Sequence, residues 1–203
     1  MQIAIIGNSI KCLSQESGAF IDSCDKVIRI NNFVIEPYEK YIGSKTTHIS
    51  LMITGEGATS GILGNPYLQT LIPNKVNKIL IPDKFRSQHL PQIERAKDHF
   101  QLPELAFNFI DSIVYDDLYD EMREYCLQRG DIRDHYYPDS GITNIVAAFH
   151  RYPDAKIYVK GFDPGREFPG QYYWATECLN YHPQKAELAK YNQLKLSGRV
   201  FDL

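Results

Sequence analysis

Hydrophobic residues along the chain fall into two alternating kinds of segment. Short apolar runs rich in β-branched residues and bounded by turn-forming residues are typical of strands. They occur at 2–9, 25–33, 45–54, 77–83, 155–163 and 199–203, with a further candidate at 101–111. Between them, apolar residues recur at helical spacing next to helix start or stop signals. These segments predict helices at 10–22, 115–130, 140–153 and 183–194.

The order of these elements predicts an α/β fold. Strands that alternate with helices are typical of a mostly parallel central sheet flanked by helices on its faces. The chain has no internal repeat, no low-complexity segment and no sign of a second domain in its pattern. We therefore expect residues 1–203 to form a single domain.

Composition narrows the class of protein without identifying it. The chain of 203 residues is 43% hydrophobic and 23% charged, which is ordinary for a soluble globular protein. Its net charge of −3 argues against nucleic acid as a partner. No apolar run reaches the roughly 20 residues that span a bilayer, so we expect no transmembrane segment. The start, "MQIAIIGNS", lacks the features of a signal peptide.

The four cysteines give no metal-site or redox pattern. They are scattered, with no Cys-x-x-Cys spacing, at Cys12, Cys24, Cys126 and Cys178. Such cysteines indicate buried or incidental thiols in a reducing compartment. We therefore expect a cytoplasmic protein.

Polar and glycine residues follow three of the predicted strands. In parallel sheets, ligands bind beyond the carboxyl ends of the strands, near the point where the strand order reverses. That rule places one set of residues on a common rim, namely Gly7, Asn8, Ser9, Asn31, Asn32 and the turn at 161–163. The "GNS" turn could receive a phosphate on its backbone N–H groups, and the asparagines supply donors and acceptors for a nucleotide. Taken singly, ordinary turn chemistry explains these residues at least as well.

Two helix starts carry further candidates. The run "DSGITN" puts Ser140 near a cap with Gly141 next to it, where free backbone N–H groups favour an anion, although plain capping is the simpler explanation. His182 stands before Pro183, at or just before the N-cap of the last helix. The positive end of that helix disfavours an imidazolium ion, so the ring would stay neutral and accept a proton. The alternative is an indifferent cap on a surface helix.

Several common signatures are missing. The sequence contains neither a G-x-G-x-x-G fingerprint nor a G-x-x-x-x-G-K-[ST] loop, and it has no G-x-S-x-G elbow. No pair of carboxylates indicates a two-acid hydrolase, and no Asp-x-Asp run suggests a divalent metal that holds a nucleotide diphosphate. The remaining histidines are better explained as structural or exposed: His48, His89, His99, His135 and His150.

Three fragments share an order with the motifs of a known family. The first is "IAIIGNSIKCLSQESGAFIDSCDKVIRINNFVIEPYEKYIGSKTTH", with its Gly-Asn-Ser turn, Asp-x-Val-Ile-Arg-hydrophobic-Asn and Gly-x-Lys-Thr-Thr. It resembles the large sialylmotif of the glycosyltransferase family 29 sialyltransferases. "YYPDSGITNIVAAFHRYPDAKIYVKGFD" is similar to the small sialylmotif, and "HPQKAE" fits the His-x-x-x-x-Glu of the very small motif. Together the three cover about two fifths of the chain.

This resemblance implies a Rossmann-like fold and a CMP-activated acidic sugar as donor, such as CMP-sialic acid or CMP-Kdo. It implies inverting transfer to a hydroxyl of a glycan or glycolipid acceptor, with no metal and no other cofactor. His182 matches the family's catalytic base, and Glu187 matches the motif partner of that base. A neutral imidazole would take the proton of the acceptor hydroxyl as the new bond forms.

The resemblance also implies a donor site. Asn8 and Asn31 match the family's donor-contacting asparagines, and Ser140 and Gly141 match small-motif residues near the donor. We add three neighbours on the predicted rim to the donor site, namely Gly7, Ser9 and Gly161.

The sequence departs from the family pattern in three ways. The third motif, usually His-Tyr-aromatic-acidic, is at best "QYYW" or "YYWA" at 171–175, so the histidine expected to help the departing phosphate is missing. Tyr172 and Tyr173 are the candidate substitutes. We expect neither the family's inter-motif disulfide nor its membrane anchor, which suits a cytoplasmic protein that is at most peripheral to a membrane. The chain is short, so we expect reduced acceptor loops, with 55–64 and 164–176 as candidate covers over the site.

Three functional hypotheses remain. The first is a glycosyltransferase that uses a CMP-activated ulosonic acid. The second is a catalytically inactive CMP- or nucleotide-binding protein on the same fold, which the altered third motif favours and the intact His-x-x-x-x-Glu opposes. The third is a different α/β enzyme that uses a nucleotide or a phosphate. The sequence specifies neither the acceptor and linkage nor the oligomeric state.

Overall fold

The computed structural model describes residues 1–51, 78–82, 91, 94–95, 98–99, 101, 107–164, 170–172, 175–178 and 182–203. The strands in this part of the chain are β1 (Gln2–Ile6), β2 (Lys26–Ile30), β3 (His48–Ser50), β4 (Lys78–Pro82), β5 (Phe107–Ile110), β6 (Lys156–Lys160), β7 (Gly170–Tyr172), β8 (Ala175–Cys178) and β9 (Val200–Asp202). The helices are η1 (Ile10–Leu13), α1 (Gly18–Ser23), α2 (Glu39–Ile42), α6 (Ser112–Leu127), α7 (Ser140–Arg151) and α8 (Gln184–Leu196).

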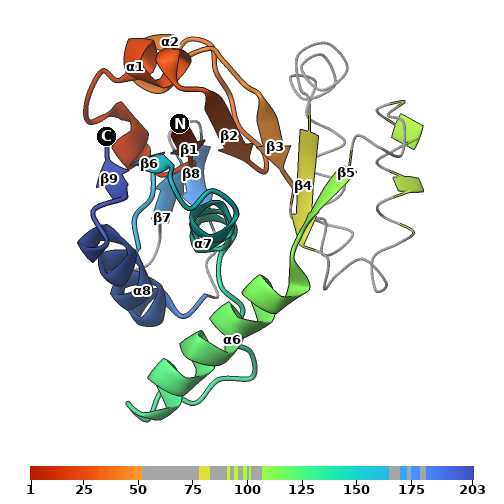
Figure 1. The fold of residues 1–203 in the computed structure, drawn as a ribbon, viewed down its shortest axis with the longest axis vertical. Helices are drawn as coiled ribbons and strands as arrows, with labels where there is room; N and C mark the ends of the chain where they lie inside the picture. Colours follow the sequence, from red (N-terminus) through yellow and green to blue (C-terminus); the bar gives the residue numbers. More distant parts are fainter. Residues whose placement is uncertain are drawn as a thin grey trace.

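A sheet with strand order β5-β4-β3-β2-β1-β6-β9 forms the centre of the molecule (Figure 1). Every neighbouring pair in it is parallel, with Ile5 of β1 opposite Ile28 of β2 on one side and Val159 of β6 on the other. The prediction of a mostly parallel sheet is confirmed. The order reverses at β1, because β2 to β5 extend to one side of it and β6 and β9 to the other.

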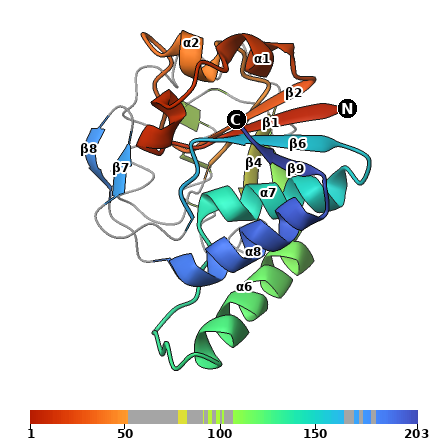
Figure 2. The same ribbon diagram turned by 90° about the vertical axis from the view of Figure 1, so that its left-hand side faces the viewer.

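Helices cover both faces of the sheet (Figure 2). The helices α1 and α2 lie over one face, and α6, α7 and α8 lie over the other, so the described elements form three layers. The short β7 and β8 pair with each other in a separate antiparallel arrangement. None of the described helices is long and apolar enough to cross a membrane.

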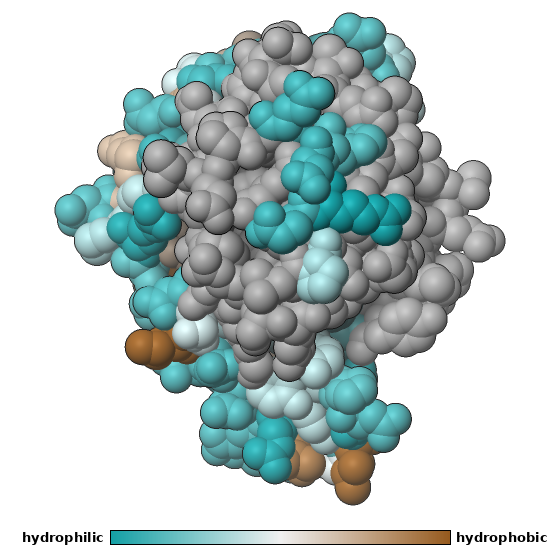
Figure 3. All heavy atoms as spheres, turned by 90° about the vertical axis from the view of Figure 1, so that its right-hand side faces the viewer, coloured by the Kyte–Doolittle hydropathy of each residue, from teal (hydrophilic) through white to brown (hydrophobic). Residues whose placement is uncertain are grey.

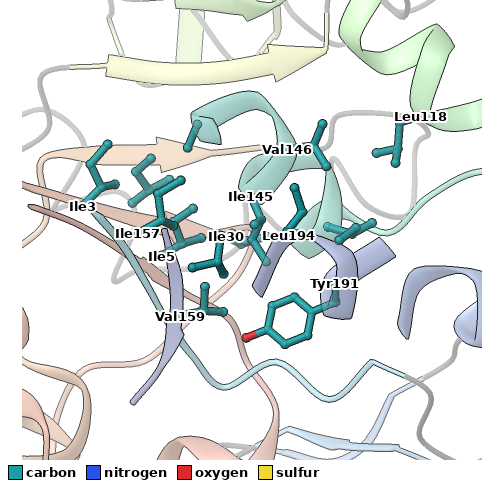
Figure 4. Close-up of a cluster of buried hydrophobic side chains, with 14 of the residues drawn as sticks. Ile3, Ile5, Ile30, Leu118, Ile145, Val146, Ile157, Val159, Tyr191 and Leu194 are labelled. Atoms are coloured by element: carbon teal, nitrogen blue, oxygen red, sulfur yellow. The ribbon is translucent and has the colours of Figure 1, made fainter. Parts of the chain in front are cut away.

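The alternation of side chains along the strands builds a separate core on each face. Ile3 and Ile5 of β1 point toward α6, α7 and α8, where they pack with Ile145, Val146 and Leu194, among others (Figure 4). Ala4 and Ile6, one residue out of phase, join the cluster under α1 and α2 that includes Cys12, Ile21 and Ile42. Burial on both faces explains why β1 has almost no polar residues.

The predicted helix at 10–22 is wrong in its continuity. The chain forms η1, leaves helical structure after Ser14, and starts again as α1. The buried ammonium of Lys160 explains the break, because its Nζ donates to the carbonyl of Gln15 at 2.8 Å and to Ser17 Oγ at 3.3 Å. A continuous helix would need the Gln15 carbonyl for its own ladder.

Other boundaries also differ from the expectations. Helix α6 begins at Ser112 rather than at residue 115, because Asp111 caps it by accepting from the amide of Ile113 at 2.9 Å. The segment after β6, expected as a loop, contains β7 and β8. The candidate strand at 101–111 is confirmed as β5, whereas α2 was not predicted. The loop at 55–64 lies outside the described residues.

Arg29 fixes the end of β2 from within the protein. Its side chain is fully buried, and its Nε donates to Thr46 Oγ1 at 2.8 Å. Its Nη2 also donates to the carbonyls of Ile42 and Gly43, at 3.0 and 2.8 Å. These bonds attach β2 to the end of α2 and to the chain that follows it.

Candidate active site

A cavity of about 140 Å³ opens beyond the carboxyl ends of β1, β2 and β6, where the strand order reverses. Ligands bind at such switch points in open α/β sheets. The walls of the cavity are formed by these strand ends and by the N-terminal ends of α7 and α8. The lining residues are Gly7, Asn8, Ser9, Ile30, Asn31, Asp139, Ser140, Gly141, Gly161, Phe162, Asp163, His182 and Glu187.

The two strand ends that flank the switch point are joined by their backbones. The amide of Gly7 donates to the carbonyl of Lys160 at 2.8 Å, and the amide of Ser9 donates to the carbonyl of Gly161 at 2.9 Å. A Cβ on Gly7 would lie 2.5 Å from the Gly161 oxygen, so the turns approach each other this closely only with glycine. Gly161 has a φ of +72°, in the left-handed region that favours glycine.

Asn8 lines the cavity and carries an unsatisfied acceptor. Its Nδ2 donates to the carbonyl of Ile30 at 2.9 Å, which holds the side chain between β1 and β2. Its Oδ1 is buried and has no hydrogen-bond partner in the described structure. A buried polar atom without a partner is destabilising unless a ligand or water satisfies it. This oxygen therefore suits a ligand that carries an N–H or O–H group.

Asn31 joins the end of β2 to the start of α7. Its backbone adopts a φ of +52°, in the left-handed region that asparagine tolerates better than most residues. Its amide donates to the carbonyl of Ser50 at 2.7 Å, and its Nδ2 donates to Ser140 Oγ at 3.1 Å. The side chain thus points across the cavity from β2 toward α7.

The N-terminal end of α7 forms another wall. Asp139, rather than Ser140, is the N-cap, because its carboxylate accepts from the amide of Ile142 at 2.8 Å. The first two helical amides, those of Ser140 and Gly141, have no intrahelical partner and belong to residues that line the cavity. A Cβ on Gly141 would lie 2.1 Å from the ring of Phe162, so glycine allows this helix end to approach the turn after β6. Such an end favours an anion.

His182 lies directly before the N-cap of α8, as expected, but Pro183 is that cap, so the helix begins at Gln184 rather than at residue 183. Its ring is half-buried at the cavity, with Nδ1 2.8 Å from the carbonyl oxygen of Tyr137. A carbonyl only accepts, so Nδ1 carries a hydrogen, and in the neutral ring the lone pair belongs to Nε2. This tautomer is the one that a general base needs if Nε2 faces its substrate.

Glu187 ties α8 to α7. It is 2% exposed, and its Oε1 accepts a hydrogen bond from the backbone amide of Asp139 at 2.7 Å. Asp139 therefore uses its carboxylate to cap α7 and its amide to hold the first turn of α8. Tyr137, which holds the His182 ring, is two residues away. One short segment thus contacts both residues of the His-x-x-x-x-Glu motif.

The three carboxylates that line the cavity each have a partner. Asp139 and Glu187 accept from backbone amides, and Asp163 forms an ion pair with Lys11 at 2.5 Å. Lys11 follows the Gly7 turn and Asp163 follows β6, so this pair spans the two flanks of the switch point.

Two buried groups lie behind the Gly7 turn. Burial lowers the pKa of Lys160 and raises the pKa of Cys12 to about 12. Neither buried group lines the cavity.

Most residues predicted from the sequence meet at this cavity. Those that line it are Gly7, Asn8, Ser9, Asn31, Ser140, Gly141, Gly161, His182 and Glu187. Asn32 does not line it. The backbone of Tyr172 belongs to β7, but its side chain and all of Tyr173 lie outside the described residues. Three thiols, Cys12, Cys24 and Cys126, are free and buried, as expected.

Sequence reasoning missed two contributors, Tyr137 and Asp139, whereas Phe162 and Asp163 belong to the turn at 161–163 that was predicted on the rim. Asp139 had a detectable signal, since an aspartate before a Ser-Gly helix start is a common N-cap. Tyr137 acts through its backbone carbonyl, which no side-chain pattern reveals. Within the described ranges, no group of three His, Cys, Asp or Glu side chains is arranged to hold a metal ion.

Comparisons with known proteins agree on one family. The model of glycosyltransferase family 29 (sialyltransferase) matches residues 2–199. The curated protein sequences gave no match. A mammalian sialyltransferase solved in complex with Gal-beta-1-3GalNAc-ortho-nitrophenol aligns with a TM-score of 0.69 and 18% identity. The alignment covers 100% of this chain and 68% of that sialyltransferase.

A bacterial structure is also similar. The sialyltransferase CstII from Campylobacter jejuni, solved with the substrate analogue cytidine-5'-monophosphate, aligns with a TM-score of 0.59 and 16% identity. The alignment covers 100% of this chain and 79% of CstII. At these identities the likeness establishes the fold, and the Rossmann-like expectation is confirmed.

Proposed function

The chain belongs to glycosyltransferase family 29, the sialyltransferases, and we propose that it transfers sialic acid, or a related ulosonic acid such as Kdo, from its CMP-activated form to a glycan hydroxyl. The proposed transfer inverts the anomeric carbon and uses His182 as general base. One observation carries the proposal: His182, held in the Nδ1–H tautomer by Tyr137, borders the same cavity as the open N-terminal end of α7. A base and an anion-binding helix end are the two parts that this reaction needs.

The leaving group in this proposal is CMP. As the bond to the sugar breaks, negative charge develops on the phosphate, and donors fixed in the protein stabilise it. The amides of Ser140 and Gly141 at the start of α7 are suitable donors, since both residues line the cavity. Asn8 Oδ1 suits a hydroxyl or amino group of the nucleoside, because it is buried and lacks a partner. CstII, on the same fold, has been solved with cytidine-5'-monophosphate and with CMP-3FNeuAc.

The nucleophile is a hydroxyl of the acceptor, a glycan or a glycolipid. A neutral hydroxyl is a poor nucleophile, so Nε2 of His182 would remove its proton while the oxygen attacks the anomeric carbon. Attack from the face opposite CMP inverts that carbon. Glu187 contributes as a positioning residue, because its bond to Asp139 fixes α8, and with it His182, against the segment that holds the ring.

The proposed reaction needs no metal, since backbone amides supply the positive partial charge at the leaving phosphate. We would incubate CMP-sialic acid and CMP-Kdo separately with the wild type in the presence of EDTA, with water or a glycan panel as acceptor, and follow CMP release. His182→Ala should lower the rate by about 10²- to 10⁴-fold, the usual range for loss of a general base. His150→Ala, an exposed histidine on α7, is the matched control and should keep the wild-type rate.

A second candidate function is CMP binding without catalysis. The sequence at 171–175 favours it, because the family's third-motif histidine is missing there. Calorimetric binding of CMP by the wild type, with no release from either donor across the whole acceptor panel, would establish that alternative. Equal release by the wild type and His182→Ala would disprove the role of His182. Release that EDTA abolishes would disprove metal independence.

A further inference from the structure

The segment between α6 and α7 contacts His182 at two points. The carbonyl of Tyr137 accepts from Nδ1 of the ring, and the guanidinium of Arg133 donates from Nη1 to the backbone carbonyl of His182 at 3.1 Å. We infer that Arg133 is a positioning residue that fixes the backbone of His182, and so the direction of its ring, from outside the cavity. This inference rests on the proposed role of His182 as the base.

His182 needs such support because of its place in the chain. It precedes the N-cap of α8, so helical hydrogen bonds do not fix its backbone. Pro183 follows it and has no N–H to donate. The carbonyl of His182 accepts from the amide of Gln184 at 2.9 Å and from Arg133. Rotation of this peptide group would swing the ring, and about 1 Å of misplacement can lower a rate about 100-fold.

Arg133 is itself held firmly at its other end. Its Nε donates to both carboxylate oxygens of Asp131, at 2.9 and 3.0 Å, and its Nη2 lies 2.9 Å from Oδ2. The hydrogen bond from Arg133 holds the pKa of Asp131 below its usual value. The amide of Asp131 donates to the carbonyl of Cys126 at 3.0 Å. The support therefore runs from the end of α6 through Asp131 and Arg133 to His182.

The backbone of Arg133 is also fixed, since its amide donates to the hydroxyl of Tyr136 at 3.0 Å. Tyr136 is buried in the core shared by α6, α7 and α8. Arg133 does not line the cavity, and it lies outside the three motif segments. Its effect on the reaction must therefore pass through His182 rather than through contact with a donor.

The test compares Arg133→Met and Arg133→Lys with Arg129→Met. Arg129 is a matched control, because it is exposed, donates to the carbonyl of Tyr125 at 3.1 Å and contacts no cavity residue in the described structure. The first readout is the imidazole spectrum of ¹⁵N-histidine protein, with the His182 signals assigned from His182→Ala. We expect Arg133→Met to shift the His182 signals toward a mixture of tautomers, Arg133→Lys to shift them less, and Arg129→Met to leave them unchanged.

The second readout separates turnover from donor binding. Arg133→Met should lower kcat about 10-fold while the CMP Kd stays within about twofold, and Arg133→Lys should recover part of the loss. His182 signals that are unchanged in Arg133→Met would overturn the inference, as would an equal loss of CMP affinity and kcat. If the wild type released CMP from no donor, only the proposed function would be overturned. The histidine spectrum would still decide whether Arg133 orients the ring of His182.

Discussion

Glu187 and Asp139 lie 48 residues apart in the chain and form a 2.7 Å hydrogen bond, from the Asp139 amide to Glu187 Oε1. This bond joins the first turn of α8 to the N-cap of α7. His182 precedes α8, and Ser140 begins α7. The proposed base and the proposed phosphate-binding amides are thus held together by one buried carboxylate.

Replacement of Glu187 should therefore affect both stability and turnover. Glu187→Ala leaves the half-buried Asp139 amide without its acceptor, so the free energy of unfolding should fall by about 1–2 kcal/mol. Glu187→Gln keeps an oxygen acceptor and should lose less. Urea unfolding and CMP release measure the two effects, with exposed Glu124→Ala on α6 as the control. If Glu187→Gln and Glu187→Ala lowered stability and CMP release equally, the hydrogen bond to Asp139 would not be the cause of the loss.

The orphan oxygen of Asn8 predicts a specific order of CMP affinities. Asn8→Ala removes one acceptor, so the Kd for CMP should rise about 10-fold, the equivalent of about 1.4 kcal/mol. Asn8→Asp keeps the shape but sets a carboxylate against the Ile30 carbonyl and beside an anionic ligand, so the Kd should rise about 100-fold.

Calorimetry measures these affinities, and exposed Asn192→Asp on α8 is the control. An Asn8→Asp variant that binds CMP as tightly as wild type would remove Asn8 from the donor site.

Gly161 and Gly198 make a matched pair for the packing at the switch point. They have φ values of +72° and +71°, so alanine strains the backbone equally at both, by about 1–2 kcal/mol. At Gly198 nothing lies within 4 Å of an added Cβ, whereas at Gly161 it would lie 2.1 Å from Cys12 Sγ. We expect Gly161→Ala to lose at least about 2 kcal/mol more in urea unfolding. Equal losses would mean that the turn relaxes freely.

Cys12 should make the protein less stable in alkaline solution. Burial raises the pKa of its thiol from 9.0 to about 12, although the charges of Lys160 and Arg29 act the other way. The unfolded chain loses this proton above pH 9 while the folded chain keeps it. The free energy of unfolding therefore falls as pH rises from about 9 toward 12, by up to about 1.4 kcal/mol per pH unit.

Comparison with Cys12→Ala isolates this contribution. Loss of the side chain changes the free energy of unfolding of the alanine variant by an amount that does not depend on pH. The variant has no thiol to ionise, so any pH-dependent difference comes from Cys12. Urea unfolding at pH 8, 9, 10 and 11 should show the wild type losing stability relative to the variant above pH 9. A difference that stays constant with pH would contradict the proposed burial of the neutral thiol.

The surface at the C-terminal end of α6 exposes hydrophobic side chains to solvent. Figure 3 shows mostly hydrophilic described residues on its face of the molecule, with hydrophobic ones near the lower end, where α6 ends. Leu127 and Ile132, which are 45% and 83% exposed, lie at that end of the chain segment. Both side chains are therefore partly or largely open to solvent.

Local patterns were sufficient for the strands of the central sheet, for α6, α7 and α8, and for most of the cavity wall. The apolar runs at 2–6, 26–30 and 156–160 specify strands, because each is buried on both faces of a parallel sheet. Once those strands are parallel, their carboxyl ends share one edge, and Gly7, Asn31 and Gly161 must meet there. The break between η1 and α1 could not be predicted, because it depends on Lys160, a residue about 145 positions away.

The sequence by itself determined which residue types stand at the ends of strands and helices, since propensity, capping and burial act over a few neighbouring positions. Only the tertiary structure decided how those ends are held. The tautomer of His182 depends on a backbone carbonyl of Tyr137, and its backbone is held by Arg133, neither of which follows from a spacing along the chain. Hydrogen bonds between distant segments have no local signature, because the geometry that makes them exists only after the sheet and helices have packed.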